Sequence, residues 1–83
     1  MKNYVPILKA MANSNRLKIL NLLKQNELNV GNLEKALDLS QSALSQHLAI
    51  LRKSGIVKTR RSAQIIYYRL ENNIVRHILN LLA

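Results

Sequence analysis

The sequence predicts a mainly α-helical fold with one small β-hairpin, in the order ααααββα. Two observations favour this order. Apolar residues recur at helical spacing through most of the chain, but after Gly55 they alternate with the two-residue spacing of a strand. Two short predicted helices are also separated only by Asp38-Leu39-Ser40, which is typical of a helix-turn-helix. A chain of 83 residues suits a single domain, residues 1–83.

The first two helices are expected within residues 5–25. Pro6 falls in the first turn of a short helix, where its missing N–H costs little. Either Asn13 or Ser14 can cap the next helix, which should run from Asn15 to about Gln25. Leucine and isoleucine side chains are spread around much of this second helix, so it should be the central buried one.

The third and fourth helices form the expected helix-turn-helix. Asn29 can cap a helix from Val30 to about Leu37. Ser40 can cap the fourth helix, which should run to Ser54. Gly55 then ends it, because glycine tolerates the left-handed conformation common after a helix.

The hairpin and a last helix complete the expected fold. Val57 and Thr59 belong to the first strand, and Ser62-Ala63-Gln64 form the tip. A fifth helix should span Asn72 to Leu82. Residues of the second strand alternate between two faces, with Ile66, Tyr68 and Leu70 on one face and Ile65, Tyr67 and Arg69 on the other.

Positive charge dominates the chain and is unevenly distributed. The formal net charge is +9, from 13 Lys and Arg against 4 Asp and Glu, and residues 39–70 contain no acidic residue. Such a surplus favours a polyanionic partner, either nucleic acid or an acidic membrane surface. A merely soluble basic protein is the alternative, but the segregation of charge disfavours it. No apolar run approaches the ~18 residues of a membrane span. We expect a cytoplasmic, nucleoid-associated protein without a membrane partner.

Several kinds of chemistry are excluded or disfavoured. The chain has no cysteine, which excludes disulfides and thiolate metal sites. It offers no nucleophile–base pair and no glycine-rich phosphate loop, since its only glycines are Gly31 and Gly55. His47 lies on the apolar side of the fourth helix, so we expect a hydrogen-bonded core histidine there. We therefore predict neither an enzyme nor a cofactor or metal site.

The fourth helix is the predicted DNA-reading element. Spaced at 100° per residue, its leucines, Ala43, His47 and Ile50 share one face, while the other face carries amides, hydroxyls and alanine. Glutamine can bond both N6 and N7 of adenine, and serine can donate to or accept from several bases. A plain solvated polar face is the alternative. We expect contacts to duplex DNA from Ser40, Gln41, Ser42, Ser45, Gln46, Ala49 and Arg52.

The basic hairpin strengthens this interpretation. A run of cations alone is usually a solvated face, but this run follows directly on the reading helix. We expect Arg60, Arg61, Gln64 and Arg69 to hold flanking phosphates, with Arg60 or Arg61 a candidate for entry into a minor groove.

The fifth helix predicts self-association. Its apolar arc spans about 160°, wider than the ~100° that covers one core. One broad contact with the chain's own core is the alternative. A dimer would place two reading helices about a two-fold axis, over a palindromic site with half-sites one helical turn apart. The expected interface comprises Val5, Ile7, Leu8, Met11, Ile74, Val75, Ile78, Leu79, Leu81 and Leu82.

Two segments carry a family resemblance. LKAMANSNRLKILNLL and ELNVGNLEKALDLSQSALSQHLAILRKSGIVKTRRSAQIIYYRL, together spanning about Leu8 to Leu70, resemble the ArsR/SmtB family of bacterial winged helix-turn-helix regulators. SQSALSQHL and Ser62-Ala63-Gln64 are most similar to its HlyU-like branch. The resemblance implies a homodimer that binds promoter DNA, and either represses transcription or relieves silencing by displacing a nucleoid protein.

The chain departs from the family's sensor members. Where metal-sensing members carry cysteines, it has Asn29 and Gly31, and its last helix offers only Glu71 and His77 as ligands. Asn21 stands where redox-responsive relatives have a cysteine. The family's known metal and cysteine switches are therefore missing here, so either the protein senses no ligand or it senses one by a route that the sequence does not show.

A winged-helix module that binds another protein is the alternative function. Such a surface should expose an apolar or aromatic anchor among its contacts. The predicted reading face carries none, which favours DNA.

Overall fold

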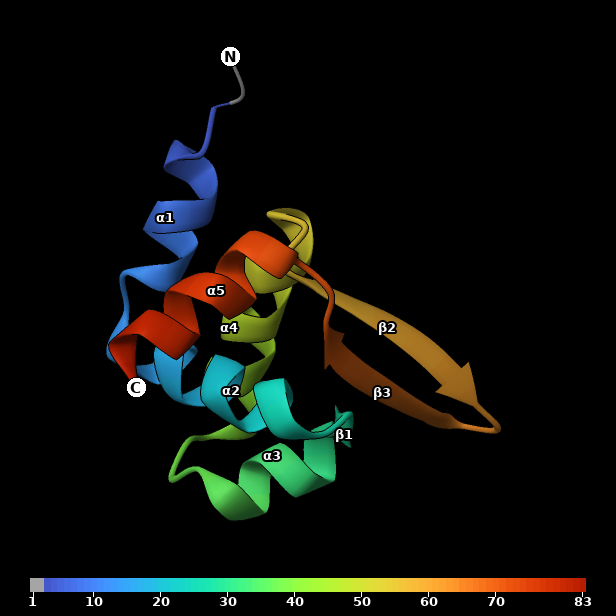
Figure 1. Cartoon of the computed structure of the whole chain (residues 1–83). Helices are drawn as coiled ribbons and strands as arrows, with labels where there is room; N and C mark the ends of the chain where they lie inside the picture. Colours follow the sequence, from blue (N-terminus) through green and yellow to red (C-terminus); the bar gives the residue numbers. More distant parts are fainter. Residues whose placement is uncertain (1–2) are drawn as a thin grey trace.

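The computed structural model describes residues 3–83 and confirms the predicted order of helices and hairpin (Figure 1). It adds a short strand, β1, between the second and third helices. The elements are α1 (Val5–Met11), α2 (Ser14–Gln25), β1 (Leu28–Asn29), α3 (Val30–Ala36), α4 (Gln41–Lys53), β2 (Val57–Ser62), β3 (Ile65–Leu70) and α5 (Asn73–Leu82).

Side-chain caps begin four of the helices. The Asn13 side chain accepts the N–H groups of Asn15 and Arg16 at 3.0 and 3.1 Å, so Asn13, not Ser14, caps α2. The Ser40 hydroxyl accepts the N–H of Ala43 at the start of α4, as predicted. Unpaired N–H groups of a first helical turn cost stability when they lack such partners, which is why these residues begin the helices.

The other two caps are also asparagines. Asn29 and Asn32 form a reciprocal pair in which each side chain accepts the other residue's backbone N–H. The Asn72 side chain accepts the N–H of Val75, so α5 begins one residue later than predicted. Gly55 has φ +77°, which confirms the predicted left-handed end of α4.

The three strands form an antiparallel sheet in the order β1-β3-β2. Strand β1 pairs Leu28 with Tyr68. The register of β2 against β3 puts Tyr68 and Leu70 on one face and Tyr67 on the other, as predicted. The expected three-residue tip is wrong: Ser62 pairs with Ile65, which leaves a turn of two residues with Ala63 at φ 56°.

The core lies around α2, as predicted. Ile19, Leu20 and Leu23 of this helix are buried, and α2 contacts α1, α4, α5 and β3. The base of the hairpin closes the core with Val57 and Leu70. The rest of the hairpin projects away from the helices (Figure 1). No helix within residues 3–83 is long and apolar enough to cross a membrane.

Arg16 joins three helices. Its Nε donates to the Ala10 carbonyl at the end of α1 at 2.5 Å, and its Nη1 lies 3.3 Å from His47 Nδ1 on α4. Because a guanidinium only donates, this contact requires an unprotonated Nδ1. His47 is therefore hydrogen-bonded as predicted, but it is half-buried at the rim rather than inside the core.

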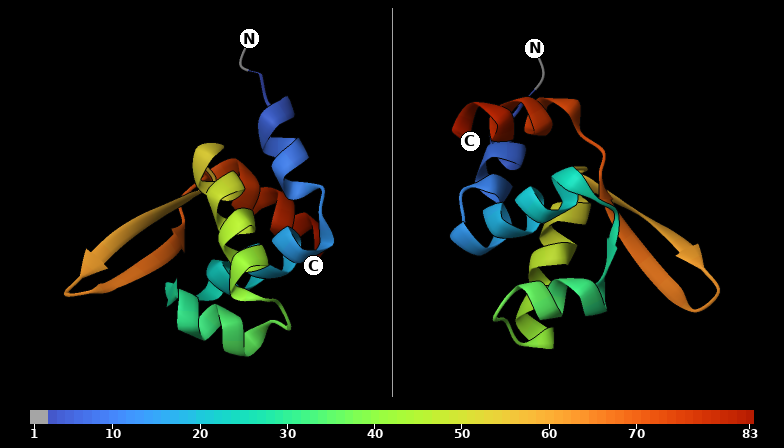
Figure 2. Two further views of the ribbon diagram at one scale, coloured as in Figure 1. Left: turned by 180° about the vertical axis from the view of Figure 1, so that it is seen from behind. Right: turned by 60° about the horizontal axis from the view of Figure 1, so that its bottom comes forward.

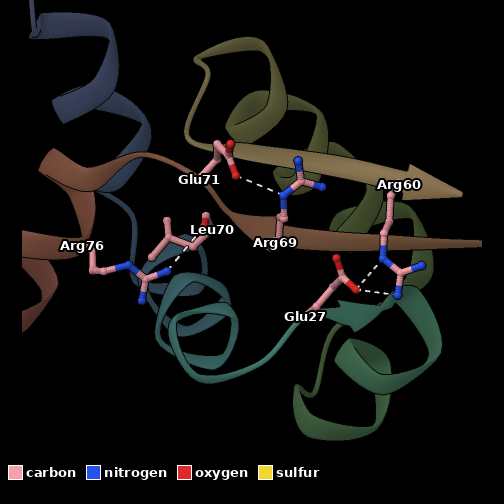
Figure 3. Close-up of polar contacts among 6 residues, drawn as sticks. All are labelled: Glu27, Arg60, Arg69, Leu70, Glu71 and Arg76. Atoms are coloured by element: carbon pink, nitrogen blue, oxygen red, sulfur yellow. Dashed lines mark hydrogen bonds and ion pairs between the residues drawn. The ribbon is translucent and has the colours of Figure 1, made fainter.

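Arg76 of α5 makes a second junction. Its Nη1 donates to the Lys24 carbonyl at 3.0 Å. Its Nη2 donates to the Leu70 carbonyl at 3.4 Å (Figure 3). The Lys24 carbonyl belongs to the last turn of α2, whose carbonyls have no partner within the helix. One side chain thus ties α5 to the end of α2 and to the end of β3.

Arg16→Met should lower the free energy of unfolding by about 2 kcal/mol, because it removes two hydrogen bonds from a charged donor and leaves the Ala10 carbonyl without that partner. Urea unfolding at a fixed protein concentration measures the change. Lys18→Met, at an exposed position of the same helix, is the matched control and should change stability by less than about 0.5 kcal/mol. Equal stability of the two variants would contradict the role given to Arg16.

Candidate nucleic-acid interface

Helix α4 presents the predicted polar face to solvent. Leu44, Leu48 and Leu51 are buried, which turns the opposite side of the helix outward. Seen from behind, α4 lies in front of the other helices and no element covers it (Figure 2). The exposed side chains on this side are named the reading face and comprise Gln41, Ser42, Ser45, Gln46, Ala49 and Arg52.

Ile50 is one apolar residue of α4 that the predicted pattern misplaced. It is 42% exposed rather than part of the buried face. It lies about 120° around the helix from the leucine row, at the edge of the apolar arc. There it borders a shallow hollow with Pro6 and Ala10 of α1 and Lys53 of α4.

The reading face continues toward the sheet. Ser45, Ala49 and Arg52 line an open hollow of about 610 Å³ together with Tyr68 of β3 and Val30 of α3. The hollow has no acidic residue in its lining. The reading helix and the hairpin therefore border one continuous surface, as expected for elements that act together.

The hairpin formed by β2 and β3, named the wing, divides its arginines between two faces. Cross-strand partners share a face, and successive residues alternate. Arg61 pairs with Ile66 and so shares the face of Tyr68, which borders the hollow beside the reading face. Arg60 pairs with Tyr67, and Arg69 with Lys58, on the opposite face.

Two of the predicted phosphate-binding arginines already have acidic partners (Figure 3). Nε and Nη2 of Arg60 each lie 2.6 Å from Oε1 of Glu27, and its guanidinium lies 4.5 Å from the centre of the Tyr67 ring. Arg69 Nε donates to Glu71 Oε2 at 3.0 Å. Across residues 3–83, these are the two ion pairs, and neither includes Arg61.

Sequence reasoning missed the partners of Arg60. Glu27 lies 33 positions before Arg60 in the chain, and the two are brought together by the pairing of β1 with β3. Strand β1 has two residues, too few to show an alternating pattern. Tyr67 could have been placed, since the predicted alternation and a short tip already set it opposite Arg60 or its neighbour.

The predicted interface residues divide by burial. Met11, Val75 and Leu79 are buried in the chain's own core, which corrects their assignment to a partner-facing surface. The wide apolar arc of α5 thus includes the stripe that packs against α2, as the alternative interpretation held. Ile7 and Ile78 are half-buried, while Val5, Leu8, Ile74, Leu81 and Leu82 are exposed.

Helices α1 and α5, which carry these exposed apolar residues, lie in the same part of the molecule. Both helices lie away from the tip of the wing in every view, and the N-terminal half of α1 extends beyond the other helices (Figures 1 and 2). In the described part of the chain, no three His, Cys, Asp or Glu side chains gather closely enough to hold a metal ion.

Residues 13–59 match the sequence model of a family described as bacterial regulatory protein, arsR family. The chain belongs to the ArsR family. This segment includes α2, α3, α4 and the first residues of β2, and so contains the helix-turn-helix and the reading face. Members of this family are DNA-binding regulators of transcription, and the chain is such a regulator rather than an enzyme.

Individual relatives agree with this assignment. The chain is 55% identical over 78 residues to the transcriptional activator HlyU of Vibrio cholerae, covering 94% of this chain and 72% of that protein. A structure of that HlyU superposes with a TM-score of 0.89, covering 94% of this chain and 85% of that one. The HlyU-like resemblance is thereby confirmed.

Two other solved structures share the winged helix-turn-helix fold. NolR from Sinorhizobium fredii is 51% identical with a TM-score of 0.88, covering 93% of this chain and 77% of that one. A homodimeric DNA-binding domain from Mycobacterium bovis is 34% identical with a TM-score of 0.84, covering 93% and 71%. The chain spans less than two thirds of some curated relatives, such as 62% of the nodulation protein NolR of Rhizobium meliloti.

Gln46→Ala should relax the choice of base at one position of a preferred DNA site, because an amide on the reading face can make two hydrogen bonds to one base. The expected loss is about 1–3 kcal/mol on the preferred site and little on unrelated DNA. Competition binding with single-base variants of the site measures both. Glu34→Ala on α3, a half-buried residue outside the reading face, is the control. An equal loss on all sequences would show that Gln46 does not read a base.

Proposed function

We propose that the chain regulates transcription by binding a palindromic promoter site as a homodimer, with one α4 helix in each of two successive major grooves. The observation that supports this most is the reading face. A solvated helix usually exposes charged residues along its length, but this one exposes amides, hydroxyls and alanine, with its two cations, Arg52 and Lys53, at the C-terminal end. The chain as a whole carries a net charge of +9, which favours a polyanionic partner.

Phosphate contacts would flank the reading face. Arg52 lies at its C-terminal end, and Arg61 and Gln64 lie exposed near the tip of the wing. Ser40 accepts the Ala43 N–H through its hydroxyl oxygen, which leaves its hydroxyl hydrogen free to donate to a phosphate at the start of α4. The dipole of α4 is also positive at this end. These contacts would orient the helix without reading sequence.

The dimer would form through α1 and α5. Both helices lie away from the tip of the wing and carry exposed apolar side chains, among them Leu8 at 50% and Leu81 at 83% exposure. Large apolar side chains that a helix leaves in water favour an interaction with a partner when they gather into one patch. The homodimeric neighbour from Mycobacterium bovis supports a second copy of the chain as the partner. A two-fold axis then implies two matching half-sites.

The same binding event can lower or raise transcription. A protein seated on a promoter blocks any other protein that needs those base pairs, whether a polymerase or a silencing nucleoid protein. We therefore infer a repressor or an anti-silencer. Relatives bear names of both kinds, an activator in Vibrio cholerae and a biofilm growth-associated repressor in Agrobacterium fabrum, which supports this common mechanism.

Selection of bound duplexes from a random library should return a palindrome with half-sites about one helical turn apart. Affinity for that site should fall with salt, with a slope of log K against log [salt] near −0.9 per phosphate contacted. Selection of sequences that contain a single half-site, without its inverted repeat, would overturn the dimeric arrangement. Failure to bind any duplex at low salt would overturn the function and favour a protein-binding module.

Leu8→Lys combined with Leu81→Lys should convert the dimer to a monomer, because it places four cations in an apolar seam. Both residues are exposed, so the folded protomer should persist. Sedimentation measures the mass, and binding to the palindrome should weaken at least tenfold although the net charge rises. Ile65→Lys, at a 44% exposed position on the wing, should leave the dimer intact. A dimeric double variant would exclude this seam.

A further inference from the structure

We infer that Arg60 is a brace that holds the wing, with Glu27 as the positioning residue, and that Arg61 is the arginine of the pair that meets DNA. The inference rests on the proposed function, because it assigns roles within the same DNA-binding surface. It changes the expectation that both arginines hold phosphates.

The guanidinium of Arg60 is already engaged in contacts within the protein. Two of its nitrogens converge on one carboxylate oxygen of Glu27 at 2.6 Å (Figure 3). Its guanidinium also stacks on the Tyr67 ring, 4.5 Å from the ring centre. The pair therefore connects the middle of the wing to the segment between α2 and β1. A side chain that makes both an ion pair and a stacking contact has few remaining conformations, so Arg60 can act as a rigid brace.

The surroundings favour a lasting contact over an incidental one. The Glu27 side chain is 28% exposed, which reduces its screening by water, and the Arg60 side chain is 49% exposed. Surface pairs contribute little in general, and two nitrogens that converge on one oxygen give this pair two contacts rather than one. Cation–π stacking adds to it. Leaving Glu27 would cost Arg60 this ion pair.

The brace also lies where it can set the angle of the wing. Beyond Val57 and Leu70 at its base, the wing is joined to the rest of the chain by the two residue pairs between β1 and β3 and by contacts of β3 with α2 and α3. The Arg60–Glu27 pair is attached next to these, at the register of Asn29 and Tyr67. It therefore reinforces the attachment that orients the outer part of the wing.

Arg61 has the opposite setting. It lies on the face of the wing that includes Tyr68, which borders the hollow beside Ser45 and Ala49. It is exposed and belongs to neither ion pair in residues 3–83. A phosphate approaching the reading face would meet Arg61 without displacing an existing partner.

A competing interpretation makes the opposite prediction for Glu27. If Arg60 left Glu27 to bind a phosphate, the acid would be a competitor, and its removal would tighten DNA binding. If Arg60 is a brace, removal of the acid loosens the wing and weakens binding, even though the net charge rises by one. The sign of the change therefore separates the two roles.

The experiment measures affinity for the selected palindrome and its salt slope for wild type, Glu27→Gln, Arg60→Glu, the charge-reversed pair Glu27→Arg with Arg60→Glu, and Arg61→Gln. A brace predicts that Glu27→Gln binds about two- to fivefold more weakly with an unchanged slope. The charge-reversed pair should bind more tightly than Arg60→Glu alone, since it restores the ion pair although not the stacking on Tyr67. Arg61→Gln should flatten the slope by about 0.9.

Two results would overturn the inference. One is tighter binding by Glu27→Gln. The other is a charge-reversed pair that stays as weak as Arg60→Glu alone, with its slope flattened by about 0.9, which would make Arg60 a phosphate ligand. Thermal unfolding of each variant separates loss of fold from loss of binding.

A DNA-independent measurement distinguishes failure of the brace from failure of the proposed function. Amide hydrogen exchange at the β1–β3 pairing should speed up about two- to fivefold in Glu27→Gln and recover in the charge-reversed pair. If no duplex binds, the proposed function fails while this exchange still tests the brace. If wild type binds DNA but Glu27→Gln changes neither the amide exchange rate nor the affinity for DNA, the role given to Arg60 and Glu27 fails while the proposed function stands.

Discussion

The burial of one row of leucines on α4 is the constraint on which the rest of the structure depends. Leu44, Leu48 and Leu51 must leave water, and α2 offers the apolar surface that receives them. A helix has only one opposite side, so this packing alone decides which residues face outward. The chemistry of the DNA-binding surface is thus set by the core, and Arg16 secures the same arrangement from the rim through His47.

Most of the fold could be predicted because its signals are local. A cap needs an acceptor a few positions before its donor, so Asn29 and Ser40 were identifiable without any tertiary information. The change of period after Gly55 likewise marks the hairpin within a few residues. Strand β1 was not predicted, because two residues are too few to show an alternating pattern and its pairing with β3 depends on the folded position of the wing.

The candidate site was predictable to the same limit. Exposure of Gln41, Ser45 and Gln46 follows from helix geometry alone, and the structure confirms it. Contacts between side chains that are far apart in the sequence leave no local pattern of residues, so Arg60 and Arg61 could not be distinguished from the sequence. Some apolar residues of α5 were wrongly assigned to a partner-facing surface. Periodicity cannot distinguish a stripe that contacts the chain's own core from one that contacts a partner. Only the burial of Val75 and Leu79 divides them.

The two-residue tip of the wing has a consequence for comparing relatives. Ala63 adopts a left-handed conformation that costs a non-glycine residue roughly 1 kcal/mol, and in return the turn locks Ser62 opposite Ile65. Strand pairing has a parity: a shift by one residue sends every side chain to the other side of the ribbon. A homologue with one extra residue at this tip either widens the turn or shifts β3 by one position, while Arg60 and Arg61 keep their faces because buried Val57 fixes β2 before the tip. Alignment columns of the second strand should therefore be matched by ribbon side rather than by letter.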